Sequence, residues 1–274
     1  MIDFFVDFFS YHFLNRALLV GVLVSLCAAL LGVSLVLKRY SMIGDGLSHV
    51  SFGSLSIAVA FHWAPLPVSI PVVMAAAFCL LRLSENSKIK GDAAIALISS
   101  SALAIGVIVM SFGSGMNADV YNYMFGSILA VSQSDVWISV SLSVIVLTLY
   151  ALFYNKIFAV TFDENFARAT GTKAALYNML LAFLTAITIV IGMRLMGALL
   201  ISSLIIFPAL TSMRVCRSFQ GVVILSAAIA VICFFIGLLL SFLFSTPAGA
   251  SVVVVNLMAL VVFTLLGKCL RRAR

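Results

Sequence analysis

Nine apolar runs, separated by short polar segments, constrain this chain more than any other feature. Each is long enough, or nearly so, to cross a bilayer, which takes roughly 20 residues of helix. The chain is 64% hydrophobic and only 9% charged, whereas soluble domains are about 25% charged. The sequence therefore predicts an all-α, polytopic membrane protein that forms one transmembrane domain over residues 1–274. The runs lie at about 15–37, 42–61, 66–82, 92–112, 134–154, 175–192, 197–211, 220–243 and 249–267.

The seventh run leaves the number of transmembrane helices open between eight and nine. It follows Met196, is shorter than the other runs and contains Pro208. A proline inside a helix removes a backbone hydrogen bond and bends or breaks the helix. The sixth and seventh runs could therefore form one bent pair, with Pro208 taking part in helix packing or gating.

The basic residues predict the orientation of the chain. Cytoplasmic segments of membrane proteins carry an excess of Lys and Arg. If the segment after the first run is cytoplasmic, nine spans place fourteen of the 16 basic residues inside and leave only Arg16 and Arg194 outside. We therefore expect the N-terminus outside and the C-terminus in the cytoplasm.

Two segments beyond the runs have patterns of their own. Residues 1–13 interleave aromatic residues with two aspartates, as in a helix lying on the bilayer, although a frayed start of the first span fits nearly as well. Residues 155–174 are cytoplasmic in the nine-span arrangement. There, Asp163 and Glu164 fit the first turn of a short helix, and Gly171 fits its end. A helix so short is unstable alone in water, so this segment needs a surface to lie against, which points to a cytoplasmic partner.

Several chemistries are missing from the sequence. It contains no GxxxxGK[ST] loop for ATP phosphates, and neither HExxH nor GxSxG. Its net charge of +7 comes from basic residues scattered between apolar runs, which argues against a nucleic-acid partner. We expect a transport protein of the lipid bilayer that is not an enzyme and holds no permanent cofactor.

Residues 41–57 are unusually polar for a membrane span. Eight of the seventeen are Gly or Ser, and Asp45 and His49 can ionise. On a helix, residues four apart share a face, about 5–6 Å from each other. A carboxylate and an imidazole so placed suit a divalent transition metal. A charge within a span costs roughly 2.5–3.5 kcal/mol, so such residues are usually paired or functional.

Two plainer interpretations of these residues stay open. Asp45 and His49 could simply hydrogen-bond to each other. Alternatively, Asp45 could cap a helix that starts near the cytoplasmic surface, since Lys38 and Arg39 are close in sequence.

Five segments of the sequence are informative as a set: LVLKRYSMIGDGLSHVSFG (35–53), YMFGSIL (123–129), DENFARATG (163–171), MGALLISSLIIFPA (196–209) and TPAGA (246–250). In the same order, they resemble segments of the permease subunits of bacterial zinc/manganese ABC importers, the ABC-3 family. The five are spread over nearly the whole chain, and the first contains Asp45 and His49.

The resemblance implies a type II ABC-importer-like permease of the bacterial inner membrane. Such a permease forms a homodimer and works with two cytoplasmic ATPase subunits and an extracytoplasmic metal-binding protein. The family's metal-path residues correspond to Asp45 and His49. The segment expected to couple the permease to the ATPase contains Asp163, Glu164, Ala167, Arg168 and Gly171.

A homodimer would complete the metal site by symmetry. One chain offers two donors, whereas zinc generally takes four in a tetrahedron. Two aspartates and two histidines around a twofold axis would supply all four. The small residues beside them, Gly44, Ser48 and Ser51, would let the two helices approach closely.

The identity of the cargo is open, and so are two rival transport functions. The wording of residues 44–50, Gly-Asp-Gly-Leu-Ser-His-Val, favours zinc, with manganese next. One rival is a cobalamin/siderophore-type ABC permease, which normally has a longer chain and no need of the Asp/His pair. The other is a secondary transporter driven by an ion gradient, and an intramembrane enzyme comes a distant third.

Overall fold

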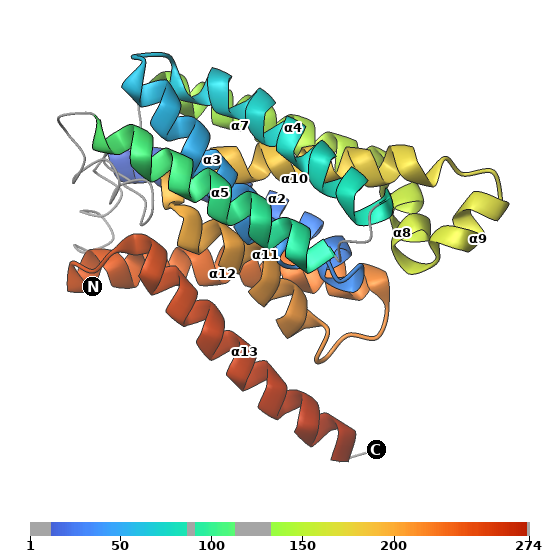
Figure 1. Cartoon of the computed structure of the whole chain (residues 1–274). Helices are drawn as coiled ribbons and strands as arrows, with labels where there is room; N and C mark the ends of the chain where they lie inside the picture. The colour runs from blue at the N-terminus through green and yellow to red at the C-terminus, as the bar shows by residue number, and fades with distance from the viewer. Residues whose placement is uncertain (1–11, 87–90, 113–132, 273–274) are drawn as a thin grey trace.

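The structure is a computed structural model that describes residues 12–86, 91–112 and 133–272, and every regular element in these ranges is a helix (Figure 1). The prediction of an all-α protein is thus confirmed. The long helices are α2 (His12–Leu37), α3 (Ile43–Ala60), α4 (Pro65–Asn86), α5 (Gly91–Ser111), α7 (Gln133–Leu152), α10 (Ala174–Met196), α11 (Ala198–Ser212), α12 (Phe219–Phe244) and α13 (Ala248–Arg272). Two short helices, α8 (Tyr154–Phe162) and α9 (Glu164–Ala169), lie between α7 and α10.

Each of the nine predicted apolar runs corresponds to one long helix. Seven of these helices are long and apolar enough, by length and composition alone, to cross a membrane. The other two are α11, which is apolar but has 15 residues, and α3, whose apolar character is diluted by glycine, serine, Asp45 and His49. The structure agrees with the expected eight or nine spans.

The sixth and seventh runs are two separate helices. Gly197 lies between α10 and α11 with a φ of +85°, a left-handed conformation that glycine adopts without steric cost. The break therefore falls at this glycine. Pro208 lies inside α11 and is buried there.

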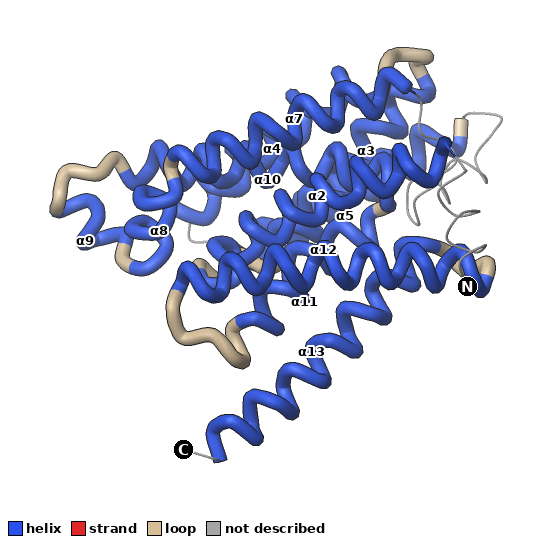
Figure 2. The backbone as a smooth tube through the Cα atoms, turned by 180° about the vertical axis from the view of Figure 1, so that it is seen from behind, coloured by secondary structure: helices blue, strands red, loops and turns tan. Residues whose placement is uncertain are grey.

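Helix α2 lies in the interior of the bundle and packs against α7, α10, α11 and α12. Helices α3 and α5 form another closely packed pair. At the edge of the bundle, as Figures 1 and 2 show, lies α13. It packs against α11 and α12, and the contact with α12 extends to Phe263. Gly267, near the end of α13, still lies close to the Arg214 carbonyl oxygen after α11.

Glycines permit the closest helix approaches. A Cβ at Gly32 of α2 would lie 2.0 Å from the Ile205 carbonyl oxygen of α11, and a Cβ at Gly53 of α3 would lie 2.6 Å from the Ala102 carbonyl oxygen of α5. Both neighbours are backbone atoms, which cannot move aside as a flexible side chain can. Small residues at such crossings are typical of membrane helices, which associate largely through close packing.

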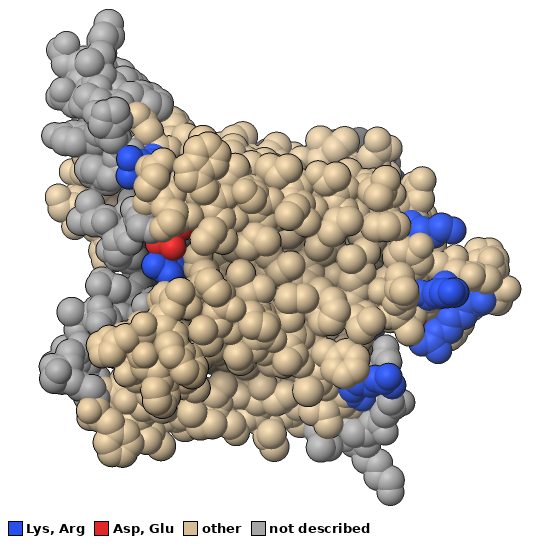
Figure 3. Space-filling view, turned by 90° about the horizontal axis from the view of Figure 1, so that it is seen from above, with Lys and Arg blue, Asp and Glu red and all other residues tan. Residues whose placement is uncertain are grey.

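The surface has the charge distribution of a membrane protein. On the face drawn in Figure 3, the Lys, Arg, Asp and Glu side chains lie at the two ends, and the broad middle carries none of them. Large apolar side chains are exposed along α5, α7, α12 and α13, among them Leu97, Ile108, Ile145, Ile232 and Val261. An apolar belt between charged ends fits a bilayer.

Three sequence predictions fall largely outside the described residues. They are the interfacial helix at 1–13, of which only the last two residues are described, the segment at 123–129, and the outer loop that contains it.

Candidate metal site and coupling helix

Both predicted metal ligands lie in the first two turns of α3. The N-cap residue is Met42, and Asp45 is the third helical residue, so Asp45 does not cap the helix. One turn later, His49 Nε2 lies 3.6 Å from Asp45 Oδ2. This distance is slightly beyond hydrogen-bond range. The two side chains therefore face each other without closing into a direct hydrogen bond.

The Asp45 and His49 side chains occupy the one open strip of a covered helix. Between Ile43 and Ser56 they are the only residues that are not buried. Helices α4, α5, α10 and α11 pack around α3. The Asp45 side chain is 49% exposed and the His49 side chain 26%, and Met42, one turn before Asp45, is also exposed. Both donors thus remain accessible to groups from outside the chain.

The spacing of the two donors fits a shared metal ion. Zinc ligands at about 2.1 Å from the ion lie about 3.4 Å apart in a tetrahedron, close to the 3.6 Å between His49 Nε2 and Asp45 Oδ2. Within residues 12–86, 91–112 and 133–272, no group of three or more His, Cys, Asp or Glu side chains could hold a metal. The described part of one chain therefore offers two donors at this place and needs others to complete a tetrahedral set.

The small residues beside the pair do not face outward, which corrects the expectation that they let two subunits approach. Gly44, Ser48 and Ser51 are buried within the chain itself. A Cβ at Gly44 would lie 3.0 Å from Ile205 Cδ1 of α11. Because α3 packs on its own neighbours over this stripe, these residues serve packing inside one chain.

The predicted coupling segment forms α8 and α9, joined at Asp163. The Asp163 side chain accepts a 2.9 Å hydrogen bond from Phe166 N and so caps α9. At the other end, Gly171 has a φ of +82°, and Thr172 N donates to Ala167 O at 2.9 Å. This is the glycine-terminated stop expected from the sequence. Figures 1 and 2 show α8 and α9 at one end of the bundle, with α9 projecting from it.

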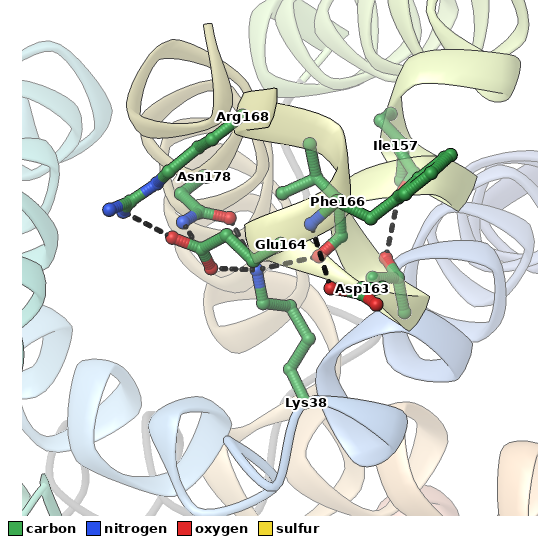
Figure 4. A network of polar contacts seen from close by, with 9 residues as sticks. Lys38, Ile157, Asp163, Glu164, Phe166, Arg168 and Asn178 are labelled. Atoms are coloured by element: carbon green, nitrogen blue, oxygen red, sulfur yellow. Dashed lines mark hydrogen bonds and ion pairs between the residues drawn. The ribbon is translucent and has the colours of Figure 1, made fainter. Parts of the chain in front are cut away.

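A polar network holds α9 against the bundle (Figure 4). Glu164 Oε2 lies 3.3 Å from Nζ of Lys38, the residue after α2, and accepts a 3.1 Å hydrogen bond from Asn178 Nδ2 of α10. Glu164 Oε1 pairs with Arg168. Burial alone would raise the pKa of the Glu164 carboxyl. The hydrogen bond from Asn178 and the charges of Lys38 and Arg168 outweigh this effect and lower that pKa below its ordinary value. The attachment is therefore fully ionised at neutral pH and weakens only as the pH falls below the usual carboxyl range.

The sequence did not predict Lys38 and Asn178 as parts of this attachment, nor the ion pair at the opposite end. Arg194 Nη2 lies 2.8 Å from Asp135 Oδ2, which joins α10 to α7, and the Asp135 side chain is only 7% exposed. Lys38, Asp135 and Arg194 are charged residues near the ends of apolar runs. Ionisable residues in such positions tend to pair. The sequence therefore indicates that these residues need partners, but it does not show which partners they take.

Comparison with known proteins decides the family. The model of the ABC 3 transport family matches residues 10–267, nearly the whole chain. The chain belongs to the ABC 3 transport family. The resemblance of its five segments to this family is thereby confirmed.

Relatives of this ABC 3 family member include permeases named for two metals. It is 29% identical to the manganese import system permease protein ScaB of Streptococcus gordonii, over 93% of this chain and 91% of that one. It is 30% identical to the high-affinity zinc uptake system membrane protein ZnuB of Haemophilus influenzae, over 89% and 94% of the two chains.

A solved structure shares the fold of this ABC 3 family member. It is PsaBC from Streptococcus pneumoniae in complex with Fab, with a TM-score of 0.86, 28% identity and coverage of 96% of this chain and 95% of that one. Membership of an ABC family favours a permease over the ion-gradient-driven transporter and the intramembrane enzyme.

Proposed function

We propose that this chain is the permease of an ABC importer that moves a divalent transition metal, zinc or manganese, into the bacterial cytoplasm, with Asp45 and His49 as its metal ligands. The observation that carries the proposal is the open strip on α3. Of fourteen consecutive residues, the only two left uncovered are a carboxylate and an imidazole, 3.6 Å apart. A cobalamin- or siderophore-type permease has no need of such a pair.

The donor set supports a homodimer and leaves the choice of metal open. Two strips related by a twofold axis give two carboxylates and two imidazoles, whose two negative charges balance a divalent cation. Both zinc and manganese accept such ligands. The names of the relatives include both metals as well. Zinc, favoured by the sequence wording, therefore remains the first ion to test and manganese the second.

The outer face of α9 is the proposed contact for a cytoplasmic ATPase. Within α9, Glu164 and Ala167 face the bundle, whereas Phe166 and Arg168 are exposed, as is Phe162 at the end of α8. This face combines aromatic and cationic groups, which are enriched at protein interfaces. Movement of the ATPase would be received here, and an extracytoplasmic binding protein would deliver the ion at the opposite end.

Uptake of Zn²⁺ and Mn²⁺ by cells that lack their own importers tests the metal assignment. We expect Asp45→Asn and His49→Ala each to abolish uptake, because each removes a donor and Asp45→Asn also removes a balancing charge. Both variants should still assemble with the ATPase. His62→Ala is the matched control, since His62 is an exposed histidine in the turn after α3, and it should transport normally. Wild-type uptake of both metals by the Asp45→Asn, His49→Ala double variant would contradict the proposal.

A further inference from the structure

A lysine at the end of α2 joins three other helices. Lys38 Nζ lies 3.3 Å from Glu164 Oε2 of α9, 3.3 Å from the Val160 carbonyl oxygen of α8, and also donates to Asn178 Oδ1 of α10 (Figure 4). The Lys38 side chain is only 11% exposed. Separating an amine so withdrawn from water from its partners is costly, because a buried charge is then left uncompensated.

Helix α9 has few other attachments. Only Ala167 of its six residues is buried, in a small cluster with Val160 and Ala174. Its charged attachment to the bundle runs through Glu164, which meets Lys38 and Asn178. Apart from its chain connections to α8 and α10, α9 is therefore attached to the bundle mainly through the Glu164 carboxylate and Ala167.

Hydrogen bonds constrain the backbone between Lys38 and the open strip of Asp45 and His49 on α3. After α2 it closes in a Schellman motif, in which Arg39 takes a φ of +62° and two amides bond back to the last turn at 3.1 and 2.8 Å. Ile43 N then donates to Tyr40 O at 3.0 Å, and α3 begins at Ile43. A hydrogen-bonded turn thus connects Lys38 to Asp45, seven residues later.

We propose that Lys38 is a positioning residue that transmits movement of α9 to the α2–α3 turn, and through it to Asp45 and His49. The inference rests on the proposed function, since it gives that metal pair its mechanical link to the ATPase. When α9 shifts, the Lys38–Glu164 pair carries the end of α2 with it. The short turn cannot absorb the shift, so the start of α3 moves as well. Lys38 itself does not touch the metal.

The first test measures coupling in the complete complex of this chain with its ATPase, reconstituted in vesicles. Lys38→Met keeps most of the side-chain length and removes the charge. Lys268→Met makes the same change at an exposed lysine near the end of α13. We expect Lys38→Met to lower the Zn²⁺ or Mn²⁺ moved per ATP hydrolysed about tenfold or more, with unchanged assembly, and Lys268→Met to leave this ratio unchanged.

A second measurement follows the turn itself and needs no metal. Met42 is 51% exposed and lies between Lys38 and Asp45. In a chain freed of its native cysteines, the maleimide labelling rate of Met42→Cys should change when nucleotide binds to the ATPase. Adding Lys38→Met should abolish that change, whereas a cysteine at Asn165 of α9 should still respond.

These measurements separate failure of the inference from failure of the proposed function. A wild-type complex that moves neither metal ends the proposed function, while the labelling at residue 42 still decides the role of Lys38. A nucleotide response at residue 42 that survives Lys38→Met overturns the inference. A loss of transport that only follows a loss of assembled complex overturns it too. Glu164→Gln should mimic Lys38→Met, and the double variant should be no worse than the more harmful single one, because both changes weaken the same pair.

Discussion

Gly171 ends the turn after α9 in a conformation that few residues other than glycine adopt. Its φ is +82°, and a Cβ added there would meet no atom within 4 Å. Any effect of a substitution is therefore conformational and not steric. Gly171→Val should cost about 1–3 kcal/mol locally, because β-branched residues are strained in this region. Misplacing α9 in this way should reduce co-purification of the ATPase or the metal transported per ATP.

Gly171→Asn serves as the control for this prediction, because asparagine tolerates the left-handed region better than valine does. It should retain most of the coupling. If the valine and asparagine variants behave alike, the conformation at Gly171 does not position α9.

Residue-scale predictions from the sequence succeeded where the helix itself determines the geometry. Asp45 and His49 were expected on one face because they are four residues apart. The caps of α9 at Asp163 and Gly171 likewise follow from local chemistry. The Lys38–Glu164 pair joins residues 126 positions apart. Such a contact depends on how the helices pack, and one sequence carries no direct signal for it.

At the scale of the helices, the crossing of α3 and α5 depends on the missing side chain of Gly53. A Cβ at Gly53 would lie 2.6 Å from a backbone oxygen, so Gly53→Ala must push the two helices apart. We expect a loss of about 1–3 kcal/mol, as for other overpacked cores. The unfolding midpoint of the purified protein in detergent measures this loss.

Gly44→Ala is the matched control on the same helix. Its Cβ would meet Ile205 Cδ1 at 3.0 Å, the far end of a flexible side chain that can move aside. The unfolding midpoint should fall less than for Gly53→Ala. Equal losses would contradict the view that backbone contact makes the α3–α5 crossing sensitive.

The hydrophobic runs showed where the helices lie in the sequence. They did not show which neighbouring helix each face packs against. The apolar runs located all nine long helices, and the short seventh run correctly left room for a break, which falls at Gly197. The stripe of Gly44, Ser48 and Ser51 was assigned to a partner subunit, yet it packs within the chain. Small residues indicate close approach without naming the neighbouring helix.

At the scale of the whole molecule, the end that carries α9 and the end that carries the Arg194–Asp135 pair are linked by α10. Asn178 near the start of α10 binds Glu164, and Arg194 near its end binds Asp135. A polar attachment thus holds each end of the bundle, and the apolar belt lies between them. The proposed contact for the ATPase and the proposed entrance for the metal would then lie at opposite ends.

The orientation of the bundle in the membrane can be tested across the single helix α3. The Lys38–Glu164 contact places the α2–α3 turn at the same end as α9. The 18 residues of α3 then carry the chain about 27 Å to the other end. Trp63, just after α3, and Asn165 on α9 are both exposed. Single cysteines at these two positions should therefore label from opposite sides of the membrane.

The basic residues predict which of these two positions faces the cytoplasm. Fourteen of the 16 fall on the α9 side when nine spans are counted, and cytoplasmic segments are rich in Lys and Arg. An impermeant maleimide should therefore label Trp63→Cys in intact spheroplasts and Asn165→Cys only after permeabilisation. Reversed labelling would mean that the charge asymmetry misleads, with α9 outside. Labelling of both from one side would mean that α3 does not span the membrane, and the strip of Asp45 and His49 could not then lie on a path across it.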